Sequence, residues 1–169
     1  RLVYAVGDVI GGLQFTHVAG YHAGVILRSI LFGLRSVAKV HHIPWVTYTN
    51  PELAQAGLTE AQALDLYGKK LEVIRHHFSH NDRAIADRRS EGMVKVIAHK
   101  KGRVLGASIL APAAGEMILA WSHAIATKAK IGSMASLIAP YPTYGDSSKR
   151  AAGSFFTAKL FSPATRRLV

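Results

Sequence analysis

The stretch at residues 139–146 (APYPTYGD) brings together side chains whose types allow acid–base or ligand chemistry. Tyr141 stands between two prolines, and Asp146 closes the stretch. A phenol has a pKa near ~10, so Tyr141 is a poor base at neutral pH, unlike an imidazole near ~6.5. It can still donate a hydrogen bond, or offer its oxygen to a bound electrophile or metal ion. The alternative is that Tyr141 and Tyr144 are aromatic packing residues at a dimer interface.

A second group of candidates lies near the start of the chain. Asp8 follows a strand-like run at residues 2–6, and a carboxylate at the end of a strand can accept hydrogen bonds from vicinal hydroxyls. Thr16 and His17 open a helical pattern, where backbone N–H groups and the positive end of the helix dipole favour negative charge. Asp8 could instead form an Asx turn or a cap, and His17 could be an ordinary polar residue of the first turn.

Histidines gather at residues 76–80 and 41–42 and raise the question of a metal site. Neighbours on a strand point to opposite faces, so His76 and His77 cannot both face one ion without a bulge. We therefore expect a polar strand end here and no metal ion.

The composition limits what these residues can do. With 169 residues, 49% of them hydrophobic and 18% charged, the chain suits one packed domain, or one domain with a piece of another. It has no cysteine, which excludes a disulfide framework and cysteine-bound metal, and leaves any thiol chemistry to residues outside these 169. The net charge of +11 raises nucleic acid as a partner. The basic residues are scattered doublets without interleaved aromatics, however, which favours solvated surface.

Two windows are apolar enough to test for membrane spans, at residues 9–27 and 104–127. Polar residues, glycines and Pro112 interrupt them, so neither is expected to span a membrane. The chain opens on Arg1 in mid-strand with no secretion signal, which suggests a fragment of a longer protein.

The elements that must position these side chains divide at about residue 43. Before it, the spacing predicts a helix over residues 14–32 that Gly33 ends. After it, the pattern predicts strands at residues 45–49, 71–79, 93–99 and 103–110. Helices are expected at residues 59–68, where Thr59 and Gln62 form a capping box, and at 115–130, 133–138 and 147–158. The fold class is α+β, an antiparallel sheet with helices packed on one face.

Several motifs in order resemble the FAD-dependent pyridine nucleotide–disulfide oxidoreductases. Residues 4–9 (YAVGDV) and 11–19 (GGLQFTHVA) resemble the last strand and helix of that family's FAD domain. The start of its C-terminal dimerisation domain is similar to residues 44–54 (PWVTYTNPELA) and 57–60 (GLTE). Further segments keep the order and spacing of that family, at residues 82–84 (DRA), 92–96 (GMVKV) and 106–110 (GASIL). The resemblance therefore covers nearly the whole chain.

This resemblance implies a remnant of the FAD-binding domain at residues 1–42 and a dimerisation domain at residues 43–169. The parent would be a cytoplasmic homodimer, similar to mercuric reductase and dihydrolipoamide dehydrogenase, with no nucleic acid and no stable membrane insertion. It would pass electrons from NAD(P)H through FAD and a redox-active disulfide to an acceptor that the sequence does not identify. The dinucleotide-binding glycine motif and the cysteine pair are missing from these residues, so we expect the chain alone to be inactive.

The resemblance also implies roles for individual residues. Asp8 would bind the ribityl chain of FAD, and Thr16 and His17 would contact the flavin. Residues 139–146 resemble a motif in which a His is followed by a Glu that orients it, and the His exchanges protons with a thiol across the dimer interface. Tyr141 stands at the His position, as in the mercuric-reductase-like branch, and Asp146 at the Glu position. Because tyrosine replaces the histidine, ordinary dihydrolipoamide dehydrogenase activity is not expected. A cis peptide bond is expected between Tyr141 and Pro142, because aromatic residues before proline occur in tight turns and the resemblance implies a cis bond at this place.

Two interpretations from other classes compete with this one. The chain could be a non-catalytic homodimerisation module in which Tyr141 only packs at the interface. It could also be a basic domain that binds nucleic acid, which would show steeply salt-dependent binding to DNA.

Overall fold

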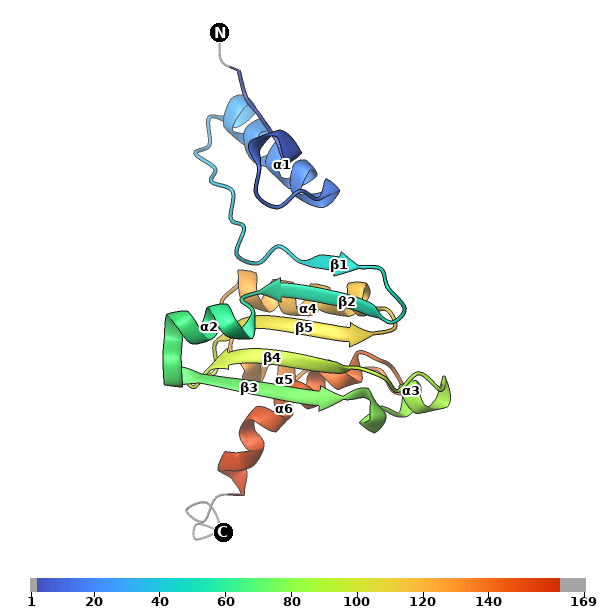
Figure 1. The fold of residues 1–169 in the computed structure, drawn as a ribbon. Helices are drawn as coiled ribbons and strands as arrows, with labels where there is room; N and C mark the ends of the chain where they lie inside the picture. The colour runs from blue at the N-terminus through green and yellow to red at the C-terminus, as the bar shows by residue number, and fades with distance from the viewer. Residues whose placement is uncertain (1–2, 162–169) are drawn as a thin grey trace. The chain divides into compact units, whose positions relative to one another are not determined.

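The computed structural model describes residues 3–161, with the side chains of residues 158 and 159 left out. The chain forms two compact units, the first running up to Ile43 and the second beginning at Pro44 (Figure 1). None of the helices within residues 3–161 combines the length and the apolar character needed to cross a membrane.

The first unit consists of a short 3-10 turn, η1 (Gly7–Ile10), and one long helix, α1 (Thr16–Phe32). Gly33 ends α1 in the left-handed conformation, with φ 64°, as the sequence predicts. The following connector folds back on the helix, since the backbone N–H of Lys39 donates to the hydroxyl of Tyr21 at 2.8 Å. The predicted opening strand was wrong for residues 3–6, which are not in a strand. A strand needs a hydrogen-bonding neighbour, and residues 3–43 contain no other strand to pair with.

The second unit is built on a five-stranded antiparallel sheet in the order β1-β2-β5-β4-β3. Its strands are β1 (Trp45–Thr47), β2 (Glu52–Gly57), β3 (Leu71–His77), β4 (Met93–His99) and β5 (Val104–Ala111). This confirms the predicted α+β class and its antiparallel sheet. The sequence analysis missed β2, because its residues, ELAQAG, lack the β-branched and aromatic side chains that mark strands.

Glycine permits the close contact at one end of β2 and β5. Gly57 pairs with Gly106 in the register of the two strands. A Cβ atom on Gly106 would lie 1.9 Å from the carbonyl oxygen of Leu58, so a side chain has no room there.

Helices cover one face of this sheet and bury its main core (Figure 1). Helix α4 (Ala114–Ala126) packs on β2 and β5, while α6 (Asp146–Leu160) packs on β3, β4 and the short α5 (Ile131–Ala135). Trp121 and Phe78 are the largest fully buried side chains of this core. Helix α4 ends four residues before the predicted limit, since Lys128 takes a left-handed conformation with φ 54°.

The opposite face carries a smaller cluster at one end. Helix α2 (Glu60–Tyr67) places Ala63 against Ile97 and Leu105. The predicted capping box is confirmed: Thr59 accepts from the backbone of Gln62, whose side chain accepts from the backbone of Thr59. The remaining elements are α3 (Asp82–Ala86) and the 3-10 turns η2 (Gly68–Lys70) and η3 (Phe78–His80).

Candidate functional site

Tyr141 lies on the segment between α5 and α6 and points outward. Its side chain is 71% exposed, and its hydroxyl donates a hydrogen bond to Oδ2 of Asp82 at 2.9 Å. Tyr141–Pro142 is a cis peptide, as predicted. The hydrogen bond to Asp82, and the charge of that carboxylate, raise the pKa of Tyr141, so its phenol is neutral at physiological pH.

Asp146, the second predicted residue of this site, makes a different contact. It is the first residue of α6, and its Oδ2 accepts a hydrogen bond from Nε of Arg150, one turn further along. The acceptor of the Tyr141 hydroxyl is therefore Asp82, although the charges of Asp146 and Arg150 also act, in opposite directions, on the pKa of Tyr141.

The sequence analysis assigned no role to Asn81 and Asp82, and both matter here. Asn81 is 2% exposed and is the N-cap of α3, with its Oδ1 accepting from the backbone of Ala84 at 2.9 Å. Its Nδ2 donates to the backbone oxygen of Thr143 at 3.0 Å and to Oγ of Ser147 at 2.9 Å. One buried amide thus ties the start of α3, where Asp82 lies, to the segment that carries Tyr141. An Asn ahead of a short helix was the available signal, but it predicts only a cap.

Tyr144 is held more tightly than Tyr141. Its hydroxyl donates to Oδ2 of Asp87 at 3.0 Å, an oxygen that also accepts from Nε of Arg83, and its ring packs against Phe78 at 5.9 Å. Burial, followed by the bond to Asp87, raises the pKa of Tyr144. These contacts pack Tyr144 within one copy of the chain and leave Tyr141 as the accessible phenol of the pair.

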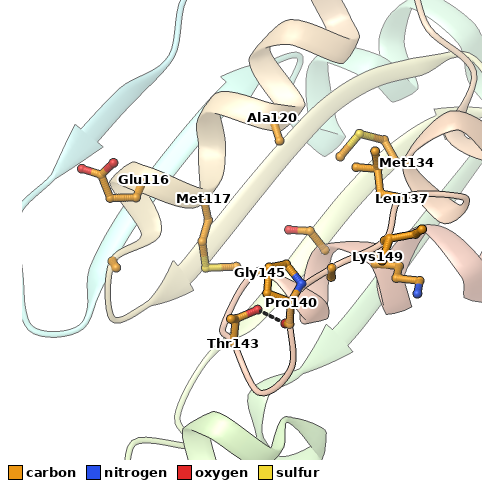
Figure 2. A pocket seen from close by; sticks show the side chains of 13 residues that line it. Glu116, Met117, Ala120, Met134, Leu137, Pro140, Thr143, Gly145 and Lys149 are labelled. Atoms are coloured by element: carbon orange, nitrogen blue, oxygen red, sulfur yellow. Dashed lines mark hydrogen bonds between the residues drawn. The ribbon is translucent and has the colours of Figure 1, made fainter.

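An apolar groove of about 390 Å³ opens beside this segment (Figure 2). Met117 of α4 and Met134 of α5 line it together with Leu137 and Pro140, and Glu116 and Lys149 lie at its margin. Ile138, which also lines the groove, is 95% exposed. An aliphatic side chain so exposed, next to an apolar groove, is typical of a surface that contacts another protein.

The three predicted flavin contacts are all in the first unit. Asp8 is exposed in η1, and this turn packs on α1, with Gly7 buried against Ala19. Thr16 and His17 are exposed at the start of α1, where, among the residues described, no side chain caps the helix. An exposed carboxylate can accept hydrogen bonds from hydroxyls, and the N-terminus of a helix favours negative charge.

The histidines near the end of β3 form a loose group. The rings of His76 and His80 are 6.1 Å apart, and burial, followed by the charge of His80, lowers the pKa of His76. In the described part of the chain, no three or more His, Cys, Asp or Glu side chains are grouped to hold a metal ion.

Comparison with known proteins places this arrangement in a family. The model of the pyridine nucleotide-disulphide oxidoreductase dimerisation domain matches residues 43–152. A mercuric reductase of Bacillus cereus is 35% identical over 155 residues, which cover 90% of this chain and 24% of that protein. A dihydrolipoyl dehydrogenase of Rhizobium etli is 37% identical over 152 residues, 88% of this chain and 31% of that protein.

Solved structures agree with the sequence matches. LpdA from Mycobacterium tuberculosis superposes with a TM-score of 0.83 at 26% identity, over 89% of this chain and 33% of that one. A Cu(II) complex of the HOCl-induced flavoprotein disulfide reductase RclA from Escherichia coli gives 0.83 at 27% identity, over 89% of this chain and 34% of that one. The chain therefore spans about a quarter to a third of the length of the relatives it matches. The resemblance expected from the motifs is confirmed, and the chain belongs to the pyridine nucleotide-disulphide oxidoreductase family, with residues 43–152 forming its dimerisation domain.

Proposed function

We propose that this chain is the C-terminal part of a flavoprotein oxidoreductase similar to mercuric reductase and dihydrolipoyl dehydrogenase. Such an enzyme passes electrons from NAD(P)H to an acceptor through FAD and a redox-active disulfide. The family match over residues 43–152 carries this proposal, because that region is the dimerisation domain of such enzymes. Residues 1–42 are then a remnant of the FAD domain, and residues 43–169 the dimerisation domain.

A second copy of this chain is the proposed occupant of the apolar groove. Burial of Ile138 and Leu137 in a homodimer removes from water apolar side chains that are 95% and 49% exposed in one copy. Ile138→Asp should convert a dimer to a monomer in sedimentation velocity, because a dimer would have to bury the new charge. Leu64→Asp on α2 is the matched control, since Leu64 is 57% exposed away from the groove, and should remain a dimer. A parent chain that is monomeric at all concentrations would contradict the homodimer.

Asp8, Thr16 and His17 are the residues that would hold FAD. In the bound state FAD supplies the two-electron redox chemistry that side chains lack. Asp8 would accept hydrogen bonds from ribityl hydroxyls, and the start of α1 would stabilise negative charge on the flavin. Asp8→Ala in the full-length enzyme should lower FAD content, measured by flavin absorbance, more than Asp65→Ala does on α2. Equal flavin content in the two variants would contradict this role.

The cysteine pair of the proposed enzyme must lie outside these residues, since the 169 contain no cysteine. The dinucleotide-binding glycine motif is also missing from these residues, so the isolated chain should bind FAD weakly or not at all and show no turnover with NADH or NADPH. A stoichiometric yellow protein obtained from residues 1–169 would overturn this expectation.

Tyr141 is proposed to meet the electron acceptor in the partner subunit's reaction pocket, with Asp146 nearby. Tyr141→Phe in the full-length enzyme should slow acceptor reduction in stopped-flow experiments but leave flavin reduction by NAD(P)H unchanged. Tyr144→Phe, which removes a hydroxyl bound within the fold, is the control and should leave both rates near those of the parent. Unchanged acceptor kinetics in Tyr141→Phe would favour the packing interpretation, and a parent without reductase activity would favour a non-catalytic dimerisation module.

The cytoplasm is the proposed location, on the strength of the resemblance alone. Fractionation of cells that express the full-length protein tests this, and recovery outside the cytoplasmic fraction would refute it.

A further inference from the structure

The single hydroxyl proton of Tyr141 is already engaged. A phenol has one O–H donor and two oxygen lone pairs. The Tyr141 hydroxyl donates to Oδ2 of Asp82 at 2.9 Å. Tyr141 itself is 71% exposed. A group approaching Tyr141 from outside therefore meets the lone pairs of its oxygen.

Asp82 is fixed in place by its neighbour. Asn81 caps α3 through Oδ1 and holds the Tyr141 segment and α6 through Nδ2, which donates to Thr143 and Ser147. Two of these three hydrogen bonds are buried and the one to Thr143 is partly buried, and together they set the position of Asp82 relative to the Tyr141 segment. Tyr141 and Asp82 therefore form their hydrogen bond between two segments, the start of α3 and the loop before α6, that Asn81 already holds together.

The other nearby carboxylate is engaged elsewhere. Asp146 accepts from Nε of Arg150 within α6, at the i,i+4 spacing of a helical ion pair. The position of Asp146, five residues after Tyr141, suggests that it orients the tyrosine. The hydroxyl of Tyr141 nevertheless donates its hydrogen bond to Asp82.

We propose that Asp82 is the positioning residue of Tyr141, holding the hydroxyl as a donor so that the oxygen acts toward the electron acceptor as a hydrogen-bond acceptor or electron-pair donor, and not as an acid. This inference rests on the proposed function, in which Tyr141 meets the electron acceptor. It assigns to Asp82 the orienting role that the family motif suggests for Asp146.

The first test measures the ionisation of Tyr141 itself. Tyrosine ring ¹³C NMR can be followed through an alkaline titration, with the Tyr141 signal assigned by its loss in Tyr141→Phe. The bond to Asp82 raises the pKa of Tyr141, so Asp82→Asn should lower it toward the ordinary value. Asp146→Asn, the matched control, should lower it less. An equal or larger shift in Asp146→Asn, or no shift in Asp82→Asn, would overturn the inference.

The second test uses the full-length enzyme. Asp82→Ala, which leaves no side-chain acceptor for the Tyr141 hydroxyl, should slow acceptor reduction on the order of tenfold through loss of positioning, while flavin reduction by NAD(P)H stays unchanged. In a Tyr141→Phe background the same change should have almost no further effect, because its partner hydroxyl is already gone. Additive losses in the double variant would show that Asp82 acts independently of Tyr141.

The two tests separate the inference from the function on which it rests. If the full-length protein reduces no acceptor, the proposed function fails, but the titration still decides whether Asp82 controls Tyr141. If the titration fails while Tyr141→Phe remains slow, the function stands and Asp82 loses its role. Asp82 is exposed, so Asp82→Asn should not disturb the fold. The backbone amide NMR spectrum of the same samples tests whether the fold is kept.

Discussion

The two units differ sharply in how much apolar surface they bury by themselves. Among residues 3–43, Val18 and Ile43 are the buried apolar side chains, while Leu31 and Phe32 on α1 are 66% and 70% exposed. The second unit encloses a continuous core under α4, α5 and α6, centred on Trp121 and Phe78. Burial of apolar area is the main source of folding free energy, so the second unit has the means to be stable alone and the first does not. Both tryptophans, Trp45 and Trp121, lie in the second unit, so fluorescence reports its unfolding selectively.

Truncation of the central core residue should have the largest effect. Trp121 is 0% exposed and its Nε1 donates to Oγ of Ser148, so Trp121→Ala leaves a cavity and an unpaired hydroxyl. The free energy of unfolding of the second unit should fall by about 3–5 kcal/mol in urea titrations followed by circular dichroism. Leu119→Ala, on the same helix but 67% exposed, should cost well under half of that. Equal losses would show that the core is not centred on Trp121.

Asn81→Ala should come next, because it removes a helix cap and the two hydrogen bonds that Nδ2 donates, one buried and one partly buried. The expected loss is about 2 kcal/mol in the free energy of unfolding, measured by urea titration. Asn81→Asp retains the acceptor for Ala84 but loses both donors, so it separates the cap from the connection to Thr143 and Ser147. If Asn81→Asp is as stable as the parent, the hydrogen bonds from Asn81 to Thr143 and Ser147 contribute nothing to the free energy of unfolding.

Thr59→Ala should destabilise the second unit by about 1 kcal/mol, since it removes the side-chain half of the α2 capping box. Thr59→Ser keeps the hydroxyl and should remain close to the parent in the same thermal and urea melts. Identical losses for Ala and Ser would assign the effect to the methyl group of Thr59 and not to the cap.

A pH dependence should follow from His76. Burial lowers its pKa in the folded chain, so the unfolded chain binds the proton more readily. The contribution of neutral His76 to the free energy of unfolding is therefore fully present at pH values above the ordinary histidine pKa, near ~6.5. It is lost as the pH falls below that pKa. His76→Gln should flatten the decline of the unfolding free energy between neutral and mildly acidic pH. An unchanged slope in His76→Gln would contradict this dependence.

Val18→Ala should have the smallest effect on the second unit. Val18 is 1% exposed within the first unit, so its truncation loosens α1 and η1. The urea midpoint by tryptophan fluorescence should be unchanged, while amide exchange in α1 becomes faster. A shifted fluorescence midpoint would show that the stabilities of the two units are coupled.

The sequence predicts best those features that depend on local chemistry. The capping box at Thr59, the left-handed Gly33 and the cis bond at Pro142 follow from short-range rules and are confirmed. Strand β2 was missed because an alanine-rich segment becomes a strand only through its pairing with β5. The link between Tyr141 and Asp82 was missed for the same reason, since 59 residues separate two side chains that the fold brings together. The assigned roles of Asp8, Thr16, His17, Tyr141 and Asp146 stay predictions.

The placement of β2 also constrains the order in which the sheet assembles. Strand β1 pairs with β2, and β2 must find β5, which lies more than 40 residues further along the chain. Pairing across so long a loop is entropically costly, whereas β4 and β5 are joined by a short turn. We therefore expect the β4–β5 hairpin to form early as a template, and the β1–β2 pair to join it late. The three residues of β1 would then be the first part of the sheet to separate when the protein fluctuates.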